Sequence, residues 1–254
     1  MKPFTAFFCK ELTELKRTGK LWILILIFVL FGIMNPAIAK LIPWMLETFA
    51  DSFAESGITL TEMTVDAMTS WTQFYKNIPM ALIIFFLLFG NIMTGEYQKG
   101  TLIPILTKGL PRRHIVTAKT LAMLLTWTGC YWLCYGITYA YNSWFWDNSV
   151  YPHPAFAALC PYVLGIWLLS LLMLMSTVFE TGSSVTVSAG VVFIAAYLLS
   201  MIPKIQDYLP ARLLNPAGIL QGIQKPEDYL AALGICLMLS LGNLMLSVIL
   251  FNKK

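Results

Sequence analysis

Two acidic side chains stand in surroundings where a carboxylate must be compensated. Glu11 lies in the middle of the apolar arc of a helical stretch, 3–17, whose opposite side is basic. A carboxylate on an apolar face needs a partner, so two interpretations stay open: a side chain that extends to lipid headgroups, or a buried partner for a basic residue in a loop. Glu96 stands in a strongly basic segment and is expected to form an ion pair or to cap a helix. Glu11 and Glu96 are therefore candidates for contacts that compensate a buried or capping carboxylate.

The other reactive residue types argue against most kinds of catalytic site. The chain has five cysteines at irregular spacing without a C-x-x-C pair, and two histidines, so neither a disulfide framework nor a zinc site is expected. It has no H-E-x-x-H motif for an intramembrane metalloprotease. It also lacks G-x-x-x-x-G-K-[ST], so it cannot hold ATP phosphates by that route. We expect no catalytic residue, metal or cofactor in this chain.

Composition places these residues on membrane helices. Of 254 residues, 58% are hydrophobic and 12% are charged, with a mean hydropathy of +0.71, which excludes soluble and disordered classes. Six apolar runs have lengths that suit a helix crossing the hydrocarbon. The sequence predicts an all-α integral membrane protein with six transmembrane helices over 21–42, 78–94, 115–139, 156–179, 185–202 and 229–251.

The distribution of basic residues predicts the orientation. With the N-terminus inside, 12 of the 17 Lys and Arg lie in cytoplasmic segments, so both termini are expected in the cytoplasm. One membrane domain, 1–254, then contains an interfacial amphipathic helix (1–20), an extracellular loop (43–77), a cytoplasmic loop (95–114) and an external segment (203–228). In the outer loop Glu47, Asp51 and Glu55 recur every four residues, as a solvated acidic face or as a vestibule that attracts cationic cargo.

Polar residues within the spans have two interpretations. Such side chains usually bond to neighbouring helices; otherwise they line a substrate pathway, and the candidates are Asn35, Asn91, Ser184, Ser188 and Asn243. No ionisable residue lies near the middle of a span, which argues against a carrier driven by an ion gradient.

The cytoplasmic loop contains the most specific pattern. It reads E-x-x-x-G-T, an apolar run, P-x-R, His-Ile and then a Lys that enters the next span. This order resembles the bacterial ABC-2 type transporter permeases, through Glu96, Gly100, Thr101, Pro111, Arg113 and Lys119. The start, Lys10-Glu11-Leu12 followed by Arg17, is also similar, and the broken segment 209–216 looks like the family's external re-entrant helices. Pro104 and Lys108-Gly109 depart from the usual residues and put the local helix end in doubt.

The resemblance implies a role in a bacterial plasma membrane, as a permease subunit of an ATP-driven exporter. In this family the segment after span two forms a coupling helix that docks on a separate ATPase subunit, which holds ATP and Mg. The implied contact residues are Glu96, Tyr97, Gly100, Thr101, Leu102, Ile105 and Leu106, supported by Glu11, Arg113 and Lys119. Gly100 is expected to permit close backbone approach, and the Thr, Leu and Ile side chains to form an apolar patch.

The implied partners are the ATPase, a second permease copy or paralogue, and membrane lipid, without nucleic acid. The implied cargo is amphipathic or hydrophobic, with peptide toxins or antimicrobial peptides favoured and drugs or lipids as alternatives. Two other functions stay open: a membrane sensor or scaffold that transports nothing, and a secondary carrier.

Overall fold

The computed structural model describes residues 3–48, 66–107 and 109–253, and all regular structure in these ranges is helical. Six long helices form the body: α2 (Lys20–Thr48), α4 (Ala67–Phe89), α7 (Arg112–Phe145), α8 (Pro154–Val178), α9 (Gly182–Leu199) and α11 (Leu230–Lys253). Shorter helices are α1 (Pro3–Arg17), α5 (Thr94–Gln98), α6 (Ile103–Thr107), α10 (Ala217–Leu220), η1 (Asn148–Val150), η2 (Gln206–Tyr208), η3 (Pro210–Leu214) and η4 (Pro226–Tyr229). The all-helical class is confirmed.

Among the described residues, five helical stretches are long and apolar enough to cross a membrane: Lys20–Met45, Ala67–Gln98, Pro154–Val178, Gly182–Leu199 and Pro226–Lys253. The third predicted span lies in α7, which has 34 residues but is not among these five. Its Trp, Tyr, Thr and Gly residues make it less apolar than the other long helices. The six-span layout therefore stays a prediction.

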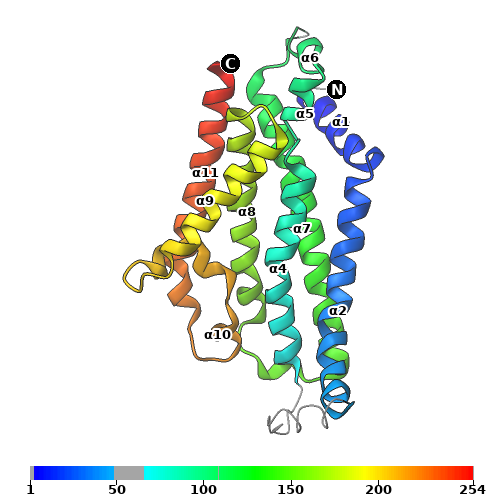
Figure 1. Cartoon of the computed structure of the whole chain (residues 1–254), viewed down its shortest axis with the longest axis vertical. Helices are drawn as coiled ribbons and strands as arrows, with labels where there is room; N and C mark the ends of the chain where they lie inside the picture. Colours follow the sequence, from blue (N-terminus) through cyan, green and yellow to red (C-terminus); the bar gives the residue numbers. More distant parts are fainter. Residues whose placement is uncertain (1–2, 49–65, 108, 254) are drawn as a thin grey trace.

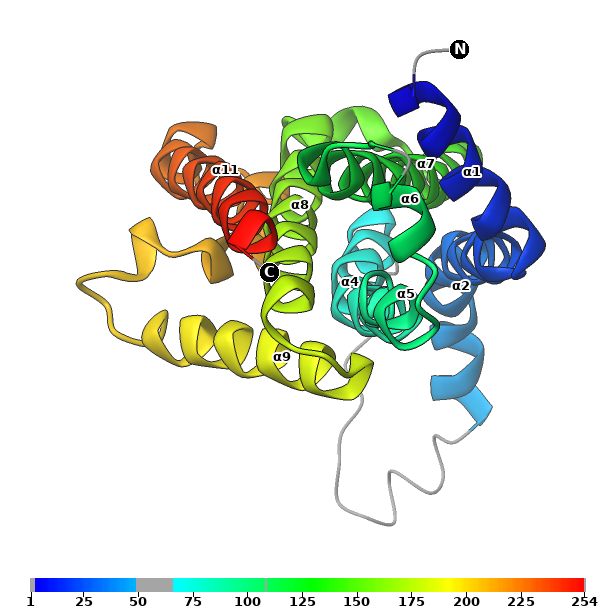
Figure 2. The same cartoon turned by 90° about the horizontal axis from the view of Figure 1, so that it is seen from above.

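The helices form two groups that meet at α7 and α8 (Figure 2). In one group α2 packs along α4 and α7, and in the other α8 packs along α11 and α9. The helices differ in burial because they differ in position. α8 contacts α7, α9 and α11, and 72% of its apolar window is buried. For α9 the buried share is only 11%. Both chain ends lie at the same end of the bundle as α5 and α6, and α10 lies near the opposite end (Figure 1).

The N-terminal helix α1 is placed by one face. Phe7, Glu11 and Leu15 are buried at intervals of four residues, the spacing that aligns side chains along a helix. This face packs against α7 and α2. Gly19, with φ +76°, makes the turn into α2.

Two helices extend into the predicted extracellular loop, 43–77. α2 continues to Thr48, and α4 begins at Ala67 behind Asp66, whose side chain accepts a hydrogen bond from Thr69 N at 3.2 Å. The loop prediction followed average hydropathy, whereas α4 continues as an amphipathic helix that buries Trp71 and Phe74. The acidic residues Asp51 and Glu55 lie outside the described residues, as does the side chain of Glu47.

The predicted external segment, 203–228, consists of single helical turns. η2, η3, α10 and η4 follow one another, and η3 packs on α8, α9 and α11. Whether the segment re-enters the membrane stays a prediction.

Candidate functional site

The segment that was predicted to form a cytoplasmic coupling helix folds into two short helices, α5 and α6. α5 ends in a Schellman motif: Thr101 N donates to Glu96 O at 3.1 Å, and Gly100 N donates to Tyr97 O at 3.1 Å. Gly100 takes the left-handed position of this motif, with φ +64°. A Cβ at Gly100 would meet no atom within 4 Å, so within this chain the glycine serves the turn and not a close approach. The turn also explains the E-x-x-x-G spacing. We call residues 94–107 the α5–α6 segment.

Lys119 of α7 joins α1 to this segment through two carboxylates. Its Nζ lies 2.9 Å from Glu11 Oε2 and 3.1 Å from Glu96 Oε2. The first contact is also a hydrogen bond, whereas the second has only ion-pair distance. The side chains of Lys119, Glu11 and Glu96 are 2%, 7% and 9% exposed, so these charges are compensated inside the protein. Glu11 is thus a buried ion-pair partner, and its partner lies in a helix instead of a loop.

Lys10 completes the set of charges. Its Nζ lies 3.0 Å from Glu11 Oε1 and 2.9 Å from Glu14 Oε2, and it also contacts Glu96. Burial acts to lower the pKa of Lys10, but the hydrogen bond with Glu96 and the charge of Glu11 outweigh it, so the pKa is raised. We call Lys10, Glu11, Glu14, Glu96 and Lys119 the charge cluster.

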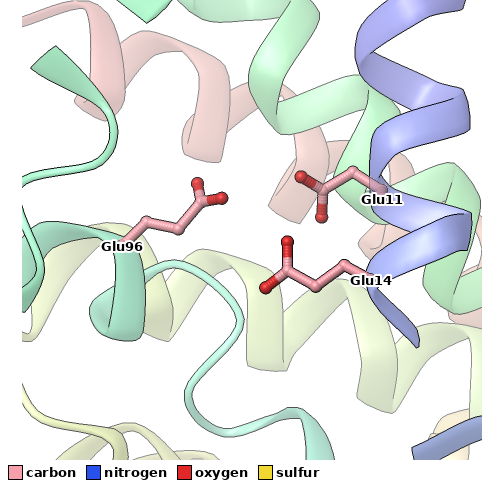
Figure 3. Close-up of side chains that lie close together, drawn as sticks. All are labelled: Glu11, Glu14 and Glu96. Carbon is pink, nitrogen blue, oxygen red and sulfur yellow. The ribbon is translucent and has the colours of Figure 1, made fainter. Parts of the chain in front are cut away.

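The three carboxylates of the charge cluster point toward one another, two from α1 and one from α5 (Figure 3). Their oxygens lie within 4.8 Å of one another, close enough to share a metal ion. However, Lys10 contacts all three and Lys119 contacts two of them. These ammonium groups supply the positive charge, so the arrangement is explained by ion pairing.

Other contacts attach the α5–α6 segment to the remaining helices. The Tyr97 ring lies 6.1 Å from the ring of Phe251 in α11. Gln98 Nε2 donates to Glu180 O, between α8 and α9, at 3.3 Å. Beside the segment, Arg112 of α7 donates from Nη1 to Phe251 O at 3.0 Å, which joins α7 to the C-terminal end of α11, a favourable place for a cation. The segment therefore contacts elements from both helix groups.

The expected apolar patch is changed by the turn at Gly100. Leu102 is only 4% exposed, so its side chain is not available to a partner, and this part of the expectation is wrong. Ile105 and Leu106 are half-buried and Thr101 is exposed. Ile103, which the sequence pattern did not single out, is 66% exposed.

The reason is that α6 begins at Ile103, so residues 101–106 do not share one helical register. Pro104, in the first turn of α6, is the sequence signal for this start.

Arg113 differs from its neighbour Arg112. Arg113 is exposed, and its described hydrogen bond is made by its backbone oxygen, which accepts from Thr117 Oγ1 at 2.9 Å. The structure does not bring its side chain to the charge cluster. Arg112, which holds the end of α11, was missed because consecutive arginines in a loop cannot be distinguished by charge alone.

Two of the proposed pathway residues bond between helices. Asn35 Nδ2 donates to Thr138 Oγ1 at 3.0 Å, and Asn77 Nδ2 donates to Asn35 Oδ1 at 2.7 Å. This joins α2, α7 and α4. Asn243 Nδ2 donates to Ser170 Oγ at 3.1 Å, which joins α11 to α8. Both have the role that polar residues most often take between membrane helices.

The other three pathway candidates lie near or within α9. Ser184 Oγ accepts from Thr181 Oγ1 at 2.7 Å, and Ser188 Oγ donates to Val185 O at 3.0 Å. Asn91 packs so closely on Gly182 that a Cβ there would be 1.5 Å from Asn91 Oδ1. Asn91 also lines a cavity of about 510 Å³ beside the charge cluster. The pathway role of the five candidates stays a prediction.

A comparison of the sequence with known protein families covers the residues described above. A family model described as ABC-2 family transporter protein matches residues 6–247, a range that includes the whole charge cluster and the α5–α6 segment. A search among curated proteins finds none that matches the chain.

Proposed function

Because this chain belongs to the ABC-2 family of transporter proteins, we propose that it is the permease subunit of an ATP-driven exporter coupled to a separate ATPase. It is a multi-pass membrane protein of a family whose transmembrane component is generally non-catalytic. ATP and Mg would be held by the partner, since the sequence has no phosphate-binding loop.

The observation that carries the coupling proposal is the attachment of the α5–α6 segment by buried charges. Glu96 is paired with Lys119 of α7 and Lys10 of α1. A force applied to the segment would therefore move α1 and α7 together, which is how a local contact becomes a rigid-body shift. Glu96 would act as a positioning residue from inside the permease.

The surface offered to the ATPase would be centred on α6. Ile103 is 66% exposed at the bundle end that carries both termini (Figure 1). An exposed isoleucine on a short helix suits insertion into an apolar cleft.

The position of the chain ends supports an even number of crossings. Both termini lie at one end of the bundle (Figure 1), whereas five crossings would place them on opposite sides. We propose α7 as the sixth span, since its 34 residues extend about 51 Å at 1.5 Å per residue. The distribution of basic residues supports a cytoplasmic location, in a bacterial cell, for the termini and the α5–α6 segment.

We propose the class of cargo from the family, and the assembly from the family and from the low burial of α9. The cargo would be amphipathic or hydrophobic, with peptides favoured. A second permease copy or paralogue would complete the pathway, and the 11% buried apolar window of α9 is a surface for this contact.

The test is reconstitution in proteoliposomes with and without a separate ABC-type ATPase subunit. We expect cargo-stimulated ATP hydrolysis and cargo movement that both require the two chains. Ile103→Asp should reduce both at least tenfold, because a charge would enter an apolar contact. Ile223→Asp changes an isoleucine that is even more exposed, at 77%; it is the matched control outside the α5–α6 segment and should leave both unchanged.

Transport driven by an ion gradient without ATP would instead identify a carrier. ATPase binding without any cargo movement would identify a scaffold.

A further inference from the structure

The charge cluster forms one wall of a cavity that the coupling proposal does not use. The cavity has a volume of about 510 Å³ and is lined by residues of α1, α2, α5 and α7, among others. Of these helices, α1 and α5 lie at the end of the bundle that carries both termini (Figure 1). Phe89 and Leu15, both buried, contribute apolar lining.

The lining carries one uncompensated positive charge. It includes four lysines and three glutamates. Lys10 and Lys119 are paired within the charge cluster. Among the described residues, neither Lys20 nor Lys99 has a carboxylate within 4.0 Å. One negative charge between these two ammonium groups would neutralise the lining.

The cavity lies at the depth where an apolar span begins. Lys20 is the first residue of the span Lys20–Met45, and its Nζ lies 5.9 Å from the centroid of the Phe89 ring, at the end of α4. A lysine at the end of a span places its ammonium group at the level of lipid headgroups. The neighbouring α1 has the basic, amphipathic character of an interfacial helix.

We infer that this cavity binds the phosphate group of an anionic phospholipid, with Lys20 and Lys99 as its two cationic ligands. A phosphodiester supplies the single negative charge that the lining lacks. Gln98 also lines the cavity, and its amide has a second N–H, beside the one that donates to Glu180 O, that can donate to a phosphate oxygen. The bound headgroup would join the start of α2 to the end of α5. Lipid binding at this site would be a property of this chain by itself and would require neither an ATPase nor cargo.

The test uses the purified full chain in detergent, with native mass spectrometry to measure lipid binding. The probes are phosphatidylglycerol, phosphatidylcholine and inorganic phosphate. We expect retention of phosphatidylglycerol by the parent, and a roughly tenfold or greater loss of affinity in Lys20→Gln/Lys99→Gln, since each lysine near an anionic headgroup adds to the attraction. Lys20→Arg/Lys99→Arg should keep the binding.

The control Lys16→Gln/Lys253→Gln removes two exposed charges that do not line the cavity. It should change the affinity less than about threefold, because distant charges are screened. Equal losses in the two glutamine variants, or equal binding of phosphatidylcholine, would overturn the site. Competition by millimolar inorganic phosphate would keep the phosphate chemistry and overturn the lipid as its source. A negative result would leave the coupling proposal intact, since reconstituted transport tests that separately.

Discussion

At the scale of single residues, Lys119 is a lysine whose charged side chain is almost completely buried. Its side chain is 2% exposed and compensates Glu11 and Glu96. Burying charges is unfavourable by itself, and a buried ion pair contributes little net stability. Removing one partner is different, because it leaves a buried charge without its counterion.

We therefore predict that Lys119→Met lowers the free energy of unfolding by about 3–5 kcal/mol. Thermal unfolding of the purified chain in detergent measures this loss. Lys16→Met, on the exposed side of α1, should stay within about 0.5 kcal/mol of the parent. Restoration by adding Glu11→Gln to Lys119→Met would show that the unpaired carboxylate is the cause. A Lys119→Met variant as stable as the parent would contradict a buried cluster.

Glu14 gives the charge cluster a defined pH dependence. Burial acts to raise the pKa of Glu14, but the hydrogen bond from Lys10 and its charge outweigh this, so the pKa is lowered from 4.5. Its stabilisation is therefore complete above pH 4.5 and is lost as the pH falls through the lower, folded-state pKa. The pKa of Lys10 is raised from 10.5, so its stabilisation is complete below pH 10.5 and is lost above.

We predict that the parent is more stable than Glu14→Gln by at most about 0.5 kcal/mol between pH 5 and pH 10, because Glu14 is half-exposed. The difference should shrink below pH 4.5 and disappear once the pH falls below the lower, folded-state pKa of Glu14. Melting temperatures of both proteins across this range are the measurement. A difference that grows on acidification would have the wrong sign for this ion pair.

The sequence predicted the ion pair of Glu11 only as one of two alternatives. Its apolar surroundings showed that compensation was needed, but its partner Lys119 is 108 residues away. Lys119 itself was selected through the family pattern. Lys10 was missed because it lies on the basic side of α1, where a lysine normally faces solvent.

At the scale of elements, the turn between α5 and α6 depends on one glycine. Gly100 has a left-handed backbone conformation, which costs an L-residue about 1–2 kcal/mol. A Cβ added at this position would lie more than 4 Å from every neighbouring atom, so conformation and not space determines the effect of a substitution.

We predict that Gly100→Ala lowers the stability of the chain by about 1 kcal/mol, and that Gly100→Asn lowers it less, since Asn tolerates this conformation. Gly136→Ala is the control, because this exposed glycine lies within α7 with no atom near a new Cβ. It should keep or raise stability by up to about 1 kcal/mol. Thermal unfolding of the three variants decides. Equal effects at both glycines would argue against the Schellman turn.

Element boundaries were predictable where hydropathy changes sharply, and not elsewhere. The start of α2 and the end of α11 agree closely with the apolar runs. The extension of α4 to Ala67 was missed because polar residues on one side lower the average hydropathy while the other side stays buried. The break between α5 and α6 was missed because an apolar run contains no sign of a left-handed residue except the glycine itself.

At the scale of the whole molecule, the two ends of the bundle should be accessible from opposite sides of the membrane. We predict that a cysteine at Gln98 reacts with a membrane-impermeant maleimide only after permeabilisation, whereas a cysteine at Ile223 reacts in intact cells. Cys9 is exposed and must first be replaced by Ser; the other four cysteines are buried. Reaction of the Gln98 cysteine in intact cells would reverse the proposed topology.

Composition predicted the all-helical membrane class, but not the contrast in burial among the helices. The sequences of α8 and α9 are similarly apolar, yet 72% of one window is buried and 11% of the other. Tertiary position decides this difference, and hydropathy does not report it.

The long sequence separation within the charge cluster also determines an order of events during synthesis. Glu11 emerges early, while Lys119 is added 108 residues later. Until then, α1 can compensate Glu11 only through its own neighbour Lys10 and must wait on the membrane surface. We therefore expect α1 to reach its final position only after Lys119, near the middle of the chain, has been synthesised. Stalled nascent chains that end before residue 119 should leave α1 accessible to protease, and longer chains should protect it.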